Sequence, residues 1–138
     1  MSPSGADTKS VRRVLLILWV AFVWTLAVYG IVMMVIRPQP TEAGPLRAVM
    51  LAFAGTTTAA ALYFRLGRIG RLLSKATPLS DTEFSQLRTN YIVCFALSEA
   101  VALYGLVLHF LGSNLAEVGP FFAASVALLL ICFPRLPA

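Results

Sequence analysis

Two ionisable side chains stand inside an apolar run that is long enough to cross a membrane. The segment "CFALSEAVALYGLVLHFLG", from Cys94 to Gly112, contains Glu99 and His109. A charged carboxylate is costly in the middle of a bilayer, so an acid at this depth is protonated, paired or functional. Because no Lys or Arg lies at the depth of Glu99, we expect its carboxyl group to be protonated at neutral pH.

Two roles for Glu99 remain open. As a structural group, it would form a hydrogen bond across a helix interface and fix the register of the helices, contributing about 1 kcal/mol. As a functional group, it would carry a proton or another cation through the membrane. In both roles we expect hydroxyl groups nearby, and the candidate hydrogen-bond partners are Thr56, Thr57 and Ser98.

His109 is a second candidate, but it cannot work together with Glu99. It lies ten residues further along the chain, which is about 15 Å along a helix. A lone histidine near the end of a span is typical of the membrane interface. The alternative is an axial ligand of a tetrapyrrole, with Met33 or Met34 completing the pair. Without a second histidine, a CxxC pair, a phosphate loop or a Ser/His/Asp set, we expect no metal site, no other cofactor and no enzyme.

The composition places these residues in an integral membrane protein. Of the 138 residues, 59% are hydrophobic and only 12% are charged, which is about half the charged share of a soluble domain. A bilayer core about 30 Å thick requires about 20 apolar helical residues. Four blocks approach this length, so we predict an all-α, four-helix membrane bundle in a single domain. Its spans are residues 13–36, 46–66, 91–111 and 118–133, with an amphipathic connection at 66–90.

The positive charges gather on one side of these spans. They lie mainly before the first span and between the second and third, and Lys and Arg mark the cytoplasmic side of a membrane protein. We therefore expect a protein of the bacterial inner membrane with both termini in the cytoplasm. We expect the positive charges behind the net charge of +5 to bind lipid headgroups and not nucleic acid. The residues expected to contact lipid headgroups are Arg65, Arg68, Arg71 and Lys75.

The third apolar helix is expected to begin before the membrane. Ser80 followed by Glu83 matches a capping box, and Leu79 and Phe84 occupy the hydrophobic-staple positions around it. This pattern predicts a helix from about Asp81 to Leu111.

The two cysteines are expected to remain reduced. Cys94 and Cys132 both fall near the cytoplasmic side of the predicted topology, where disulfides are rare. We predict that they are small packing residues.

The chain also repeats itself. The shift that places Arg13 on Arg88 also aligns "AVYGIV" (27–32) with "ALYGLV" (102–107), and "EAGPLRA" with "EVGPFFA". Each copy contains two spans, so both would have the same orientation in the membrane, related by a pseudo-twofold axis along its normal. We predict two tandem, parallel-repeat helical hairpins.

Residues 84–111, "FSQLRTNYIVCFALSEAVALYGLVLHFL", resemble the carboxylate-bearing helix of the proteolipid ring subunits of rotary ATPases. That family has a Glu or Asp in mid-helix among small residues, after a polar cytoplasmic loop. The resemblance implies that Glu99 is an ion-binding carboxylate. The chain departs from the family in its second span, which has only Gly55 in place of a dense glycine pattern, and in its long, basic polar loop.

Together these features predict a small, non-catalytic membrane protein of the structural or accessory-subunit type. It would act through helix packing with other membrane subunits or with further copies of itself. The alternative is a subunit that translocates protons or cations through Glu99.

Overall fold

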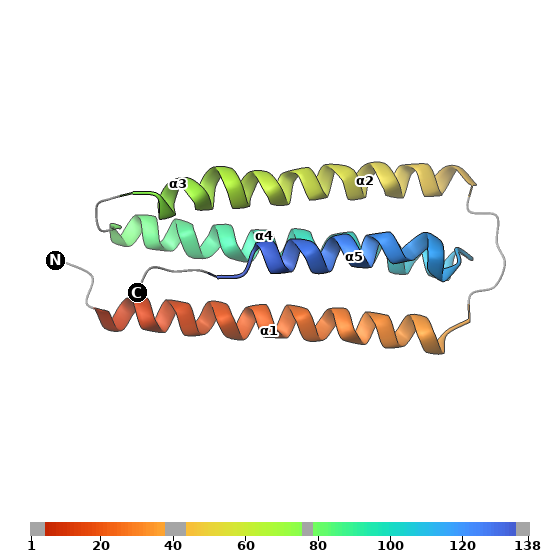
Figure 1. Cartoon of the computed structure of the whole chain (residues 1–138), viewed down its shortest axis with the longest axis horizontal. Helices are drawn as coiled ribbons and strands as arrows, with labels where there is room; N and C mark the ends of the chain where they lie inside the picture. Colours follow the sequence, from red (N-terminus) through yellow and green to blue (C-terminus); the bar gives the residue numbers. More distant parts are fainter. Residues whose placement is uncertain (1–4, 38–43, 76–78, 135–138) are drawn as a thin grey trace.

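The computed structural model describes residues 5–37, 44–75 and 79–134, and every regular element in these ranges is a helix (Figure 1). The π-helix η1 and the short helix α3 continue α2 without a break, so the three form one rod. The predicted all-α four-helix bundle is confirmed. Its elements are α1 (Gly5–Val35), α2 (Gly44–Leu62), η1 (Tyr63–Ile69), α3 (Gly70–Leu73), α4 (Asp81–Phe110) and α5 (Leu115–Ile131).

Helix α4 is the centre of the bundle. It packs against α1, α2, η1 and α5, whereas α1 and the α2–η1–α3 rod lie on opposite sides of the α4–α5 pair (Figure 1). In the most apolar part of each helix, 44% of α4 is buried, against 11% of α1 and 11% of the α2 rod. The two outer helices therefore present most of their apolar surface outward.

Three helices are long and apolar enough to cross a membrane: Lys9–Val35, Gly44–Leu73 and Asp81–Phe110. Their outward residues include Trp24, Leu66 and Met34, which are 72%, 70% and 81% exposed. A soluble monomer rarely exposes contiguous apolar patches of this kind, whereas a bilayer covers them. Helix α5 has 17 residues, which is about 25 Å and less than a full bilayer core.

The ends of α4 follow signals that the sequence carries. The Ser80 side chain accepts a hydrogen bond from the backbone of Glu83, and the Glu83 carboxylate accepts one from the backbone of Ser80. The predicted capping box is thus confirmed, and α4 begins at Asp81. At the other end, Gly112 has a φ of 99°, a left-handed conformation that glycine adopts without a Cβ penalty and that stops the helix.

Most Lys and Arg residues lie at one end of the bundle, which we call the basic end. It contains α3 and the first turns of α1 and α4 (Figure 1). Helix α5 stops well short of this end (Figure 1). The Lys and Arg residues in these segments are Lys9, Arg12, Arg13, Arg71, Lys75 and Arg88, with Arg65 and Arg68 following in η1.

The two repeated segments have the same orientation but pack differently. Helices α4 and α5 pack directly against each other, so that a Cβ atom on Gly105 would lie 2.8 Å from the Cβ of Phe121. The equivalent residue of the first copy is Gly30, and a Cβ atom there would have no neighbour within 4 Å. Because α4 and α5 separate α1 from α2, the first copy does not form a closed hairpin.

This difference predicts opposite outcomes for the same substitution at equivalent positions. Gly105→Ala forces α4 and α5 apart and should cost about 1–3 kcal/mol, the usual cost of overpacking. Gly30→Ala meets open space and should be neutral or stabilising by up to about 1 kcal/mol, because alanine favours the helix. Thermal unfolding of both variants in detergent measures the difference, and equal melting temperatures would contradict the packing asymmetry.

Candidate functional site

Glu99 lies near the middle of α4 and contacts α1. The hydroxyl group of Tyr29 donates a hydrogen bond to Glu99 Oε1 at 3.0 Å, and both side chains are partly buried. Among the described residues, the salt bridges are Arg47–Glu117 and Lys75–Glu83, so no cation pairs with Glu99 there. A phenol hydroxyl can donate to a carboxylate or to the carbonyl oxygen of a protonated carboxyl group, so this contact suits both forms of the acid.

The three hydroxyl groups predicted to accompany Glu99 form hydrogen bonds elsewhere. Thr56 is exposed and donates to carbonyl groups of its own helix at 3.0 Å. Thr57 shares a hydrogen bond of 3.3 Å with the hydroxyl group of Tyr104. Ser98 donates to a carbonyl group of its own helix at 2.8 Å. The hydrogen-bond partner of Glu99 is therefore a tyrosine of α1 and not a hydroxyl of α2 or α4.

Tyr29 and Tyr104 are equivalent residues of the repeated "YG" motif, and each connects two helices through its hydroxyl group. Tyr29 bridges α1 to α4, and Tyr104 bridges α4 to α2. The sequence repeat could have identified these two tyrosines as candidate site residues, because it places a tyrosine at the same position of both copies. It could not show which helix each hydroxyl reaches, since that depends on how the helices rotate against one another.

His109 joins the ends of three helices opposite the basic end. It is only 3% exposed. Its Nε2 lies 3.0 Å from the carbonyl oxygen of Ile36, just after α1, and its Nδ1 lies 3.2 Å from that of Ser113, in the α4–α5 turn. A tetrapyrrole iron would need one of these nitrogens, so axial ligation requires breaking a contact that holds the helix ends together. Met34, one of the residues suggested as a second ligand, is 81% exposed on α1.

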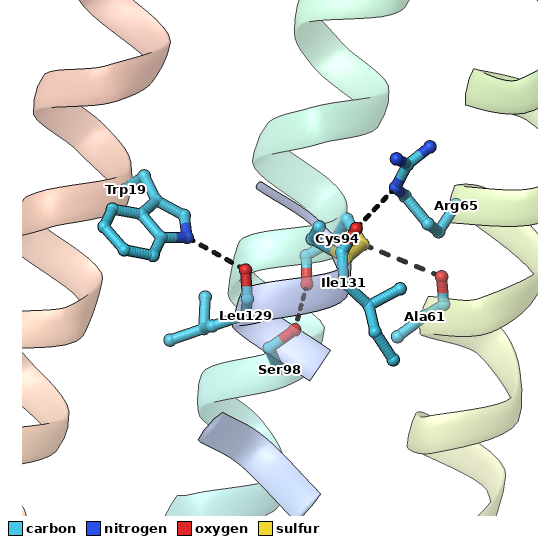
Figure 2. The surroundings of a disulfide bond; sticks show 8 residues. Trp19, Ala61, Arg65, Cys94, Ser98, Leu129 and Ile131 are labelled. Atoms are coloured by element: carbon cyan, nitrogen blue, oxygen red, sulfur yellow. Dashed lines mark hydrogen bonds between the residues drawn. A yellow bond between two sulfur atoms is a disulfide. The ribbon is translucent and has the colours of Figure 1, made fainter. Parts of the chain in front are cut away.

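The C-terminal end of α5 is held by side chains from two neighbouring helices (Figure 2). Trp19 of α1 donates its indole N–H to the carbonyl oxygen of Leu129 at 2.9 Å, and Arg65 of η1 donates from Nε to that of Ile131 at 2.7 Å. The last carbonyl groups of a helix have no partner within the helix, and they carry the negative end of its dipole. A guanidinium group meets both needs, because its N–H groups donate hydrogen bonds to the unpaired carbonyl groups and its positive charge interacts favourably with the negative end of the dipole.

A disulfide bond fastens the same end of α5 to α4. Cys94 and Cys132 are joined, with their Cα atoms 6.5 Å apart, and both are 0% exposed. The prediction that both cysteines stay reduced is therefore wrong. It considered the compartment on the basic side and not the fact that both residues face each other inside the bundle. Cys94 Sγ also lies 3.7 Å from the carbonyl oxygen of Ala61 (dashed in Figure 2). The disulfide sulfur carries no proton, so this contact would become a hydrogen bond only on reduction to the thiol.

The basic residues predicted to contact lipid divide into two pairs. Arg65 is engaged with the end of α5, and Lys75 forms an ion pair with Glu83. The guanidinium group of Arg68 lies over the Phe64 ring, 5.8 Å from its centroid. Within the described ranges, the side chain of Arg71 donates one hydrogen bond, from Nε to the carbonyl oxygen of Gly67 in its own helical rod. Arg68 and Arg71 thus keep their charge available.

No protein-family model, curated protein or solved structure matches the chain.

Reducing the disulfide should destabilise the bundle. The bond closes a loop across 38 residues, and a disulfide of ordinary strength contributes about 2–4 kcal/mol. We expect the melting temperature of the purified protein to fall when a phosphine reductant is added. The double variant Cys94→Ala, Cys132→Ala should melt at one temperature with or without reductant. Two freely alkylated cysteines in the unreduced, denatured protein would contradict the bond.

Proposed function

We propose that the chain is a non-catalytic membrane subunit that acts by helix packing, with the outward face of α2 as its contact surface. The observation that supports this proposal is a patch of small residues on α2, all of them exposed: Ala48, Ala52, Gly55, Thr56 and Ala59. We call it the small-residue face. Small side chains let two helix backbones approach closely within a membrane, which is the main route to helix association there.

The contrast with α1 favours a protein partner on α2 and lipid on α1. Most outward residues of α1 are large, including Trp24, Ile31 and Met34, and large apolar side chains contact acyl chains well. The inner side of α2 also uses small residues, since Ala54 and Ala61 are buried against the rest of the bundle. Helix α2 therefore has small residues on two sides. The rest of the chain covers the inner side and leaves the small-residue face exposed.

A bulky residue on the small-residue face should release the partner. Ala52→Phe should weaken association by about 1–3 kcal/mol, which is about 5- to 150-fold, while the chain itself still folds. The control is Val20→Phe, because Val20 is 59% exposed on α1. Native mass spectrometry after mild detergent extraction measures the assembled fraction. A wild-type protein found only as a single chain, or equal loss in both variants, would refute the proposal.

Ion carriage by Glu99 is the second candidate. What supports it is a mid-helix acid without a cationic partner in the described chain, held by one tyrosine hydroxyl at 3.0 Å. The resemblance of residues 84–111 to rotary ATPase ring subunits points in the same direction. In that role the proton or cation would exchange at the carboxyl group, and Tyr29 would orient it.

Proton flux separates the two roles of Glu99. In the accessory role, proteoliposomes of the wild type and of Glu99→Gln take up protons at the rate of empty vesicles, and the substitution costs only about 1 kcal/mol of stability. In the ion-carrying role, the wild type conducts and Glu99→Gln abolishes the flux. Glu117→Gln is the matched control, because Glu117 lies in the first turn of α5 and pairs with Arg47.

A further inference from the structure

A pocket of about 330 Å³ opens at the basic end, between the η1–α3 rod and the first turns of α4. Its volume is in the range of cavities that hold small organic ligands. The π-helix that forms one wall is a rare element, and π-helical turns occur frequently at functional sites. The lining residues are Tyr63, Arg68, Arg71, Leu72, Gln86 and Asn90.

The pocket contains a buried polar side chain, Asn90, in addition to its charged residues. It is only 7% exposed and lines the cavity, yet within the described ranges its amide group forms no hydrogen bond with another residue. Its amide atoms are accessible from the cavity. A polar ligand bound there can therefore form hydrogen bonds with them.

The charge of the pocket is uncompensated. Neither Arg68 nor Arg71 forms a salt bridge with any residue that the structure describes. Glu83 lies three residues before Gln86 in α4, and its carboxylate forms an ion pair with Lys75. The Nε of Arg71 is held by the carbonyl oxygen of Gly67 at 3.1 Å, which positions the guanidinium group at the pocket and leaves its terminal nitrogens free to bind.

We propose that this pocket binds a phosphate group, supplied by the headgroup of an anionic membrane lipid. Two guanidinium groups match the geometry of phosphate oxygens, which they bind through paired N–H donors. The amide groups of Asn90 and Gln86 can donate to further phosphate oxygens or accept from headgroup hydroxyls. The pocket lies where the apolar part of the α2 rod gives way to charged residues, which is the depth of the headgroups. The proposed site uses two of the four basic residues that the sequence predicted to contact lipid. Arg65 and Lys75 do not take part, because each is already paired within the protein.

Native mass spectrometry of the full chain tests the site. Purified protein is mixed with equal amounts of phosphatidylglycerol and phosphatidylcholine, and the lipid retained per chain is measured. We expect the wild type to retain one phosphatidylglycerol. Binding should weaken at least tenfold in Arg68→Gln/Arg71→Gln and in Asn90→Ala. It should be unchanged in Arg12→Gln/Arg13→Gln, which removes the same charge from exposed positions of α1.

Competition with glycerol 3-phosphate identifies the source of the phosphate. Retention of the lipid at millimolar competitor assigns the site to a headgroup, and displacement assigns it to a soluble phosphate monoester. Equal retention of both lipids, equal loss in the α1 control, or full binding by Asn90→Ala would overturn the site. If Asn90→Ala melts early, Gln86→Ala replaces it, because Gln86 is exposed and its loss spares the core.

Discussion

The short fifth helix ends partway along the bundle, and the packing of the basic half depends on how that helix end is held by its neighbours. With 17 residues, α5 ends well short of the basic end of the bundle, where α4 begins (Figure 1). Its last carbonyl groups have no partner within the helix and accept hydrogen bonds from neighbouring side chains. Trp19 supplies one from α1 and Arg65 supplies another from η1. The Cys94–Cys132 bond adds a covalent tie to α4, so three helices converge on one helix end.

The duplicated segments do not pack as duplicates. Helix α4 occupies the centre and α1 and α2 are displaced to its two sides (Figure 1). Gly105 is pressed against Phe121, whereas Gly30 faces open space. The two motif tyrosines keep a common task, since each hydroxyl group links a pair of helices, but their partners are an acid in one case and a threonine in the other. A repeated sequence thus supports two different sets of contacts.

Basic residues that look equivalent in the sequence have different roles in the folded chain. Four cations in eleven consecutive positions read alike in the sequence. In the folded chain, Arg65 ends α5 and Lys75 joins the capping box through Glu83, so their charges are engaged within the protein. Of the four, Arg68 and Arg71 line the cavity. The same cavity contains the amide of Asn90, which has no hydrogen-bond partner in the part of the chain that the structure describes. The division arises because helix rotation, and not composition, decides which charges meet a partner.

The sequence by itself determined the class of the protein, its helices and several of their ends. Apolar block length predicts the long helices, and the Ser80–Glu83 spacing predicts the start of α4, because both depend on residues close together in the chain. Only the tertiary structure decided that Tyr29 and not a threonine contacts Glu99, that Cys94 meets Cys132, and that His109 clamps helix ends. These contacts join residues far apart in the chain. Their geometry depends on the relative rotation and depth of whole helices, which local spacing does not encode.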